Sequence, residues 1–272
     1  MSASKPLTPA ERLLQSFGIT EPDEIDLEAI GYGMNARVRY RSLEGCEARI
    51  VGTMDAAIIT VHSGSTPRRK RFSIAHELGH WHHHRGKCLA CRVEDMRGDD
   101  RGSTHPERVA NRFAADLLLP DYLFRSIARQ HAKLNFKTIS ALADLFDASK
   151  TATAIRLVEN DHAPALLVCH GPQGRKWFTR SPSVPTKWFP QETLDADSFA
   201  FGVQFGGKPD DPMPRKIGAD AWFDRPDASR FEVQEQTARV GEHETLSLVL
   251  VSDPDMLEEA KHHTKFFRTQ RF

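Results

Sequence analysis

The sequence predicts an α+β protein built from two domains. Short segments with alternating or β-branched side chains lie before residue 62 and again after residue 164, and most segments with helical periodicity lie between them. The polar stretch at residues 159–162, followed by Ala163 and Pro164, separates the two patterns. With 272 residues, of which 39% are hydrophobic and 27% charged, the chain is long enough for two ordinary domains. We therefore expect a first domain over residues 1–160 and a smaller second domain over residues 161–272.

The predicted elements of the first domain follow a strand-rich part and then a helix-rich part. Helices are expected at 9–17 and 26–30, and strands at 36–40, 48–51 and 57–61. Five helical segments come next, at 71–84, 107–119, 122–131, 138–146 and 151–158. Pro120 ends the second of these five, because proline cannot continue a helix. The first domain should therefore be mainly helical with a small sheet.

In the second domain we expect four strands and a loop. The strands are predicted at 165–169, 199–205, 230–237 and 246–251, and the Pro/Gly-rich loop at 206–214. Tryptophan and phenylalanine side chains in this part are expected to form a hydrophobic core.

Composition excludes several classes of protein. Lys+Arg and Asp+Glu both number 37, so the formal net charge is zero, which argues against a dedicated nucleic-acid coat but leaves a local basic patch open. No apolar run approaches the roughly 20 residues that span a bilayer, and the first 12 residues lack the apolar core of a secretory signal. Four cysteines do not make a disulfide scaffold. We expect a cytoplasmic protein with no membrane partner, whose oligomeric state the sequence leaves open.

The chemistry is expected where the histidines gather, since five of the 13 lie between residues 76 and 84. Residues 76–80 read H-E-L-G-H, and helical spacing places His76 and His80 on one face, where two imidazoles can bind one zinc ion. Glu77 between them is then the candidate base for hydrolysis of a peptide bond. The alternative is a chance occurrence of the motif on a surface helix, and the apolar residues around the motif argue against it.

The third zinc ligand is less evident from the residues. A longer motif with a third histidine does not fit, because residue 83 is His83 and residue 86 is Gly86. Glu107 on the next helical segment is a candidate and shares a face with Asn111. The same glutamate can instead close a capping box with Thr104 at the start of its own helix. Rival carboxylates between the two helices are Asp95, Asp99 and Asp100. Chemistry alone leaves these alternatives open.

Two blocks of the sequence resemble the ImmA/IrrE family of zinc metallopeptidases. Residues 71–80 (RFSIAHELGH) and 107–120 (ERVANRFAADLLLP) are similar to the family's R-F-(T/S)-I-A-H-E-L-G-H and E-x-x-A-N-x-F-A-x-x-L-L-x-P. The resemblance covers roughly the first 160 residues and implies a zincin-like domain in which His76, His80 and Glu107 bind zinc and Glu77 is the base. The family often has a further glutamate where this chain has Val109, which favours Glu107 as the ligand. For the second domain the resemblance implies a GAF-like sensor.

Other residues near the motif are candidates for supporting roles. His84 lies one turn after His80, and His84 and Asn111 are expected to contact the zinc ligands. Cys88 and Cys91 form a lone C-x-x-C shortly after the motif, and a thiolate from Cys91, or else Cys88, can occupy the open zinc position and inhibit the enzyme. The alternative is two semi-buried thiols without a role.

Two features bear on nucleic acid. Residues 138–158 have the outline of a helix-turn-helix, which the family commonly contains. Its second helix has only Lys150 and Arg156 as cations, so we favour packing over DNA reading. A basic cluster precedes the zinc motif and consists of Arg68, Arg69, Lys70 and Arg71. It can be a solvated helix start, a contact for an acidic substrate or a nucleic-acid contact, and nucleic acid therefore remains a candidate activator.

Taken together, the residues and the resemblance predict a zinc-dependent endopeptidase with a protein substrate. The resemblance implies that the substrate is a helix-turn-helix repressor, whose cleavage switches on stress, defence or mobile-element genes. Two alternatives from other classes are a DNA-responsive regulator with a structural zinc and a partner-binding, antitoxin-like module whose peptidase site is a relict.

Overall fold

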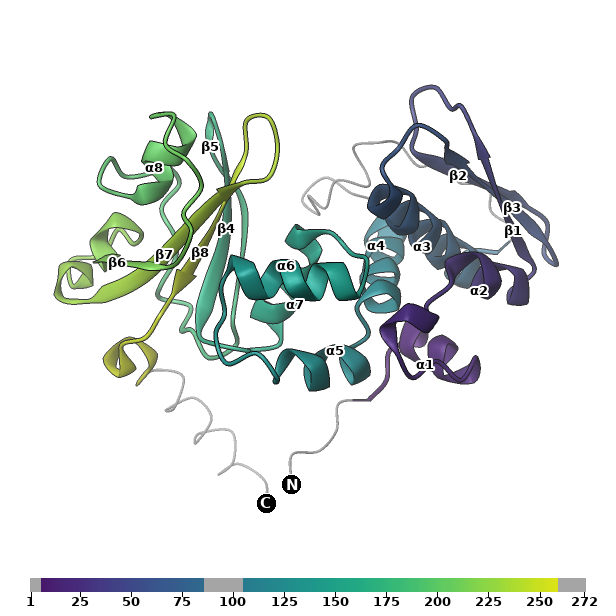
Figure 1. The fold of residues 1–272 in the computed structure, drawn as a ribbon, viewed down its shortest axis with the longest axis horizontal. Coiled ribbons are helices and arrows are strands. Elements are labelled where there is room, and N and C mark those ends of the chain that lie inside the picture. The colour runs from purple at the N-terminus through teal and green to yellow at the C-terminus, as the bar shows by residue number, and fades with distance from the viewer. Residues whose placement is uncertain (1–5, 86–104, 259–272) are drawn as a thin grey trace, which may run out of the picture. The chain divides into compact units, whose positions relative to one another are not determined.

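The computed structural model describes residues 6–85 and 105–258 and contains helices around two β-sheets (Figure 1). The predicted α+β class is confirmed. The chain forms two compact units, one comprising residues 1–127 and 142–149 and the other comprising residues 128–141 and 150–272. The boundary expected after residue 160 falls between a helix and a strand of the second unit. The assignment of separate domains on either side of it stays a prediction.

The first unit contains a three-stranded sheet and the helices that carry the zinc motif. Its elements are α1 (Pro9–Ser16), a 3-10 helix (Pro22–Glu24), α2 (Leu27–Gly33), β1 (Ala36–Arg41), β2 (Ala48–Gly52), β3 (Ala57–His62), α3 (Pro67–His83), α4 (His105–Leu118) and α5 (Asp121–Ala128). The predicted strands and helices of this part all occur, although α3 begins earlier than expected. Thr66 precedes the helix and Pro67 occupies its first turn, where proline is favoured.

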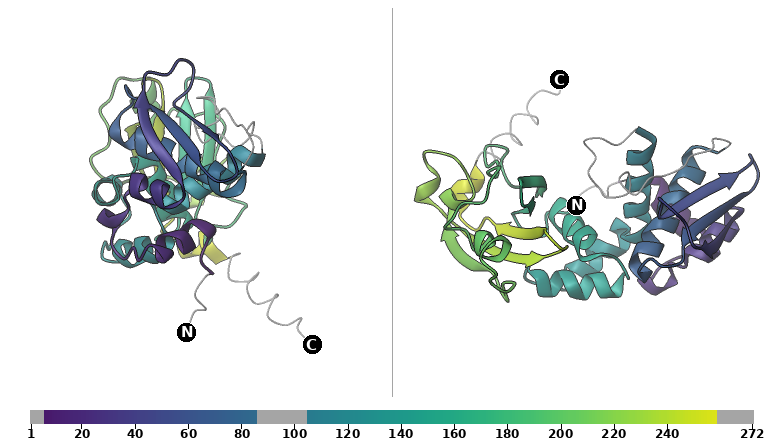
Figure 2. Two further views of the ribbon diagram at one scale, coloured as in Figure 1. Left: turned by 90° about the vertical axis from the view of Figure 1, so that its right-hand side faces the viewer. Right: turned by 90° about the horizontal axis from the view of Figure 1, so that it is seen from above.

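The small sheet has the order β1-β3-β2, with β1 parallel and β2 antiparallel to the central β3. Side chains alternate between its two faces, and Ile50, Ile59 and Val61 on the inner face are at most 5% exposed. Helix α3 packs against this inner face, and Figure 2 (left) shows the sheet in front of the helix. The opposite face of the sheet is turned to solvent.

The two units share the segment between α5 and the second sheet. It contains α6 (Phe136–Leu145) and α7 (Lys150–Glu159), which form the predicted helix pair at 138–158. Backbone contacts assign residues 142–149, at the end of α6 and in the turn after it, to the first unit and α7 to the second.

The second unit is built on a five-stranded antiparallel sheet with the order β5-β4-β8-β7-β6. Its elements are β4 (Ala165–Gly171), β5 (Gly174–Arg180), α8 (Phe199–Gln204), β6 (Arg215–Gly218), two 3-10 helices (Ala219–Ala221 and Ala228–Arg230), β7 (Glu232–Arg239) and β8 (Thr245–Leu250). Every residue of β4 is buried, because α7 packs on one face of the sheet and a hydrophobic core with Trp188 and Trp222 covers the other.

One predicted strand is wrong: residues 199–205 begin with α8 rather than forming a strand. The alternating phenylalanines Phe199, Phe201 and Phe205 imitate a strand pattern. Ser198 caps the helix by accepting a hydrogen bond from the backbone N–H of Phe201 at 3.1 Å, and Ala200 is buried against the sheet. Capping and tertiary packing therefore override the strand pattern.

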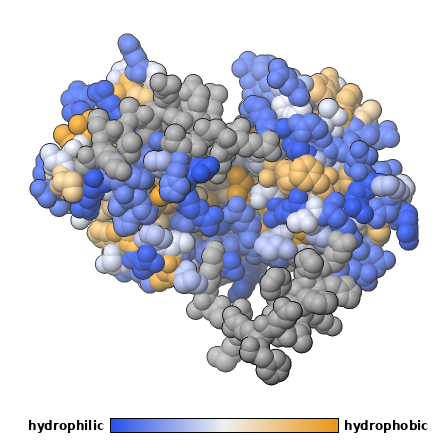
Figure 3. Space-filling view, turned by 180° about the vertical axis from the view of Figure 1, so that it is seen from behind, coloured by the Kyte–Doolittle hydropathy of each residue, from blue (hydrophilic) through white to orange (hydrophobic). Residues whose placement is uncertain are grey.

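The surface seen in Figure 3 is mainly hydrophilic, with hydrophobic residues among the polar ones. Over residues 6–85 and 105–258, no helix is both long and apolar enough to cross a membrane.

Candidate metal centre

Helix α3 supplies two of the candidate ligands from a buried stretch. His76 is 0% exposed and His80 is 1% exposed, and all residues between Ser73 and Trp81 are buried. The indole N–H of Trp81 donates a hydrogen bond to the carbonyl of Met34 at 2.7 Å, which fixes this end of the helix to the chain before β1. Polar side chains are rarely buried this deeply unless they have partners.

Helix α4 approaches α3 closely because residue 79 is glycine. A Cβ atom at Gly79 would lie 2.9 Å from the Cα atom and 3.0 Å from the carbonyl oxygen of Ala110. Since both atoms belong to the backbone of α4, any side chain here would push the helices apart. Glu107 lies one turn before Ala110, so the close contact also places Glu107 opposite the two histidines.

The three candidate ligands meet in a compact group. Nε2 of His76 lies 3.1 Å from Nε2 of His80, and 3.1 Å from Oε2 of Glu107. Nε2 of His80 lies 3.3 Å from Glu107 Oε1. All candidate ligand atoms lie within 4.8 Å of one another, and all three residues are buried. It is the one such group of three or more histidine, cysteine or acidic residues within the part of the chain that the structure describes.

This group fits a zinc ion. Ligand atoms about 2.0–2.1 Å from a tetrahedral zinc ion are roughly 3.3 Å apart, which is close to the separations found here. Two imidazoles and one carboxylate are also a donor set of catalytic zinc sites, which keep a fourth position for water or substrate. Glu107 therefore has the position expected for the third ligand. The competing capping residue Thr104 and the rival carboxylates Asp95, Asp99 and Asp100 lie outside the described residues.

The surroundings orient the ligands and shift their pKa values. Nδ1 of His76 lies 2.9 Å from Oδ1 of Asn111, an atom that can only accept, so the ring proton sits on Nδ1 and Nε2 faces Glu107. Burial lowers the pKa of His76, and nearby Glu107 partly offsets this effect. Burial works to raise the pKa of Glu107, but the two imidazoles outweigh it and hold this pKa far below its usual range. These shifts favour a neutral imidazole of His76 and an ionised carboxylate of Glu107, the forms that bind metal.

The other predicted residues of the motif lie close to this group. Glu77 is fully buried on α3 between the two histidines. His84 is half-buried at the end of α3, with its ring centroid 5.7 Å from that of His80. The roles of Glu77 as base and of His84 and Asn111 as supporting residues stay predictions. Cys88 and Cys91 lie outside the described residues.

The basic cluster before the motif is used largely within the first unit. Arg68 forms ion pairs with Asp144 at 2.6 Å and Asp147 at 3.3 Å, and Arg71 pairs with Asp147 at 3.3 Å. These contacts connect α3 to the end of α6 and the turn that follows. Arg69 also lies 3.9 Å from Glu47, and Lys70 lies over the ring of Tyr40 at 5.7 Å. Contact of this cluster with substrate or nucleic acid stays a prediction.

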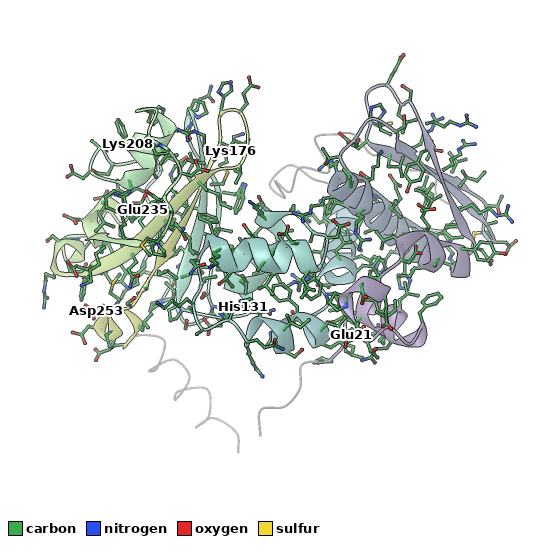
Figure 4. All side chains as sticks on the ribbon, viewed as in Figure 1. Glu21, His131, Lys176, Lys208, Glu235 and Asp253 are labelled. Atoms are coloured by element: carbon green, nitrogen blue, oxygen red, sulfur yellow. The ribbon has the colours of Figure 1, made fainter. Side chains whose placement is uncertain are left out.

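A buried acidic residue of the second unit was not expected from the sequence. Glu235 on β7, labelled in Figure 4, is 0% exposed and accepts four hydrogen bonds. The donors are the backbone N–H groups of Phe199 and Ala200, the indole of Trp222 and the hydroxyl of Thr237. Burial raises the pKa of Glu235, and these bonds oppose the increase. Because residues 234–237 are all polar, the sequence pattern gives no sign that Glu235 is buried. In the structure this glutamate holds α8 on the sheet.

Comparisons with known proteins agree with this geometry. The model of the peptidase M78 family, described as the IrrE N-terminal-like domain, matches residues 33–158. Among solved structures, a Mycobacterium tuberculosis transcriptional regulator is similar, with a TM-score of 0.55 and 15% sequence identity over 89% of this chain and 86% of that chain. At this identity the likeness concerns the fold alone. A comparison with curated proteins gives no significant match.

The matched segment contains both sequence blocks that resemble ImmA/IrrE proteins and all three residues of the buried group. A GAF-like character of the second unit stays a prediction. Residues 33–158 of this chain match the peptidase M78 family and therefore form an IrrE N-terminal-like domain.

Proposed function

We propose that this protein is a zinc-dependent endopeptidase. The observation that carries the proposal is the meeting of His76, His80 and Glu107 from two helices, with their ligand atoms within 4.8 Å and buried. The match of residues 33–158 to a peptidase family supports hydrolysis rather than a purely structural metal.

In this proposal each residue of the site has a defined task. His76, His80 and Glu107 would hold the ion, and Asn111 keeps the proton of His76 on Nδ1 so that Nε2 is available. When bound, zinc supplies Lewis-acid chemistry that polarises a peptide carbonyl and lowers the pKa of water. Glu77 accepts the proton of the attacking water on its carboxylate and then delivers it to the leaving amine. Burial of Glu77 next to the ligands suits this task, because a carboxylate outside bulk water is a stronger base.

We further propose that the substrate is a helix-turn-helix transcriptional repressor. Support comes from the resemblance to the ImmA/IrrE family and not from any specificity pocket in this chain. Cleavage would release genes for stress, defence or mobile elements. A small repressor gene next to the gene of this protein would be the first substrate to test, by mixing the two proteins with zinc and identifying a discrete cut by mass spectrometry.

The substitution Glu77→Gln tests the peptidase assignment directly. Since the amide cannot accept a proton, we expect at least about a 100-fold loss of cleavage rate, the contribution typical of a general base. Zinc content should remain one ion per chain, because Glu77 is not among the proposed ligands. The matched control is Glu244→Gln, a substitution outside the metal centre, which should cleave like the wild type. Unchanged cleavage in Glu77→Gln would contradict the proposal.

A second candidate is a regulator with a structural zinc and no proteolysis, bound to DNA or to a protein partner. The helix pair α6–α7 favours it, and so does the similar Mycobacterium tuberculosis protein, which is a transcriptional regulator. For such a protein, Glu77→Gln should change neither the affinity for the partner nor the expression of the regulated gene. Loss of His80 should change both.

A further inference from the structure

The solvent-facing side of the small sheet has an unusual concentration of arginine. Three of these residues, Arg37, Arg39 and Arg41, occupy alternate positions of β1, and Arg49 lies on β2. Strand pairing sets Arg39 and Arg49 on either side of Thr60 of β3. Because alternate residues point to the same side, all four lie on the face opposite α3. We name these four arginines the arginine face.

The arginines of this face are exposed and have no counter-charge among the residues that the structure describes. Within the described parts of the chain, none of the four forms an ion pair, and the one hydrogen bond of their side chains runs from Nε of Arg39 to Oγ1 of Thr60 at 2.8 Å. Glu47, the acidic residue at the end of the same face, contacts Ser65 and Arg69 instead. The basic cluster at residues 68–71 differs, because two of its arginines pair with aspartates. The outer face of the sheet therefore presents four exposed arginines that pair with no acidic side chain among the described residues.

We propose that the arginine face binds an extended acidic segment of a protein partner. Alternate arginines on β1 are spaced by about 6.6 Å, the same distance as alternate side chains of an extended peptide. Carboxylates at every second position of such a peptide can each meet one guanidinium, whose fork matches the two oxygens of a carboxylate. Between the strands, Arg39 and Arg49 are separated by about 10 Å, so one peptide can contact both rows.

The remaining side chains of the face also suit a peptide. Val51 and Ile58 are paired across β2 and β3 beside Arg37, and they are 57% and 42% exposed. They offer an apolar contact at one end of the charged rows. None of the nine described residues that face outward on or next to these strands is Phe, Tyr or Trp. These residues are Arg37, Arg39, Arg41, Glu47, Arg49, Val51, Ile58, Thr60 and His62. Sheets that bind single-stranded nucleic acid usually present such rings for base stacking, so the face favours an acidic peptide over nucleic acid.

This binding surface is separate from the metal centre. Helix α3, which carries His76 and His80, packs on the opposite face of the sheet. The proposal therefore does not depend on peptide hydrolysis, and it can be tested with the Glu77→Gln protein as well as with the wild type.

The test measures binding of a fluorescent twelve-residue peptide with alternating Glu and Thr, by anisotropy at low salt. We expect the double substitution Arg39→Glu/Arg49→Glu to weaken binding by about 10- to 30-fold, since each exposed ion pair contributes up to roughly fivefold. The matched control Arg129→Glu/Lys133→Glu changes the net charge equally at exposed positions of the other unit and should bind like the wild type. Circular dichroism and zinc content, unchanged in both variants, would show that folding is intact.

Three results would overturn the proposal. The first is equal affinity of the wild type and Arg39→Glu/Arg49→Glu for the peptide, and the second is an equal loss in the control variant. The third is tighter binding of a twelve-nucleotide oligo-dT than of the peptide, with the same dependence on Arg39 and Arg49, which would assign the face to nucleic acid. A fall in the affinity for the Glu-Thr peptide when the salt concentration rises from 50 to 200 mM would support the proposal, provided that a peptide with Lys in place of Glu shows no such fall.

Discussion

At the scale of single residues, the candidate metal centre depends on contacts between side chains far apart in the sequence. His76 and Asn111 are separated by 35 positions, and their 2.9 Å contact determines which nitrogen of the imidazole faces the other ligands. The spacing of four residues between Glu107 and Asn111 indicates a shared helix face. The contact itself is not predictable from that spacing, because it requires the packing of α4 against α3.

The substitution Asn111→Ala should lower the affinity for zinc by about 10- to 100-fold, because the ring of His76 loses the acceptor that orients it. Competition with a chromophoric chelator measures this affinity. Asn111→Asp keeps an oxygen acceptor in the same place and serves as the control, with an affinity at or above that of the wild type. If Asn111→Ala bound zinc as tightly as the wild type, the orienting role of Asn111 would be refuted.

At the scale of elements, the close packing of α3 and α4 builds the centre. Sequence predicts both helices well, since the relation between His76 and His80 is local and the apolar face of α4 repeats with helical spacing. The assignment of Glu107 as third ligand is different. It joins residues 27 positions apart, and the chemistry of the residues alone does not distinguish Glu107 from the rival carboxylates.

Other elements show why local pattern is not enough. Strand β5 is not evident in the sequence because it consists mainly of polar residues such as Arg175 and Lys176, and it is ordered by pairing with the buried β4. The arginine face likewise needs the register of three strands, since Arg39 and Arg49 become neighbours only through Thr60. Pairing between strands, rather than the intrinsic strand propensity of single residues, therefore determines both β5 and the arginine face.

The substitution Gly79→Ala should disturb α3–α4 packing. Its methyl group would meet backbone atoms of Ala110 at 2.9 and 3.0 Å, so we expect a loss of roughly 1–3 kcal/mol in the free energy of unfolding and weaker zinc binding. Chemical denaturation and zinc titration measure the two effects. Gly202→Ala in α8 is a matched helical control, because there the methyl group meets only the flexible side chain of Lys208. A Gly79→Ala protein with wild-type stability and zinc affinity would contradict this view of the interface.

At the scale of the whole molecule, all three candidate ligands belong to one of the two compact units. Zinc should therefore act on the stability of that unit and leave the second sheet unaffected. A ligand present at 1,000 times its dissociation constant stabilises the state that binds it by about 4 kcal/mol. Removal of the ion is thus expected to lower the free energy of unfolding of the first unit by about this amount.

Hydrogen–deuterium exchange with and without a chelator would measure this effect. We expect faster exchange in α3 and α4 after zinc removal and unchanged exchange in β4 and β8. The second set of peptides serves as the internal control, because these strands belong to the other unit. Equal loss of protection in both sets would show that the units unfold together and would refute the prediction.

The sequence separation of His80 and Glu107 has one more consequence. A bound ion that joins two points of the chain 27 residues apart acts as a cross-link and closes a long loop. By the chain-entropy relation used for disulfides, a loop of this length restricts the unfolded chain by about 3.5 kcal/mol. Unlike a disulfide, this link forms under reducing conditions and is reversible with metal supply. The supply of zinc would then set how much of the first unit is folded, in addition to how much of it is active.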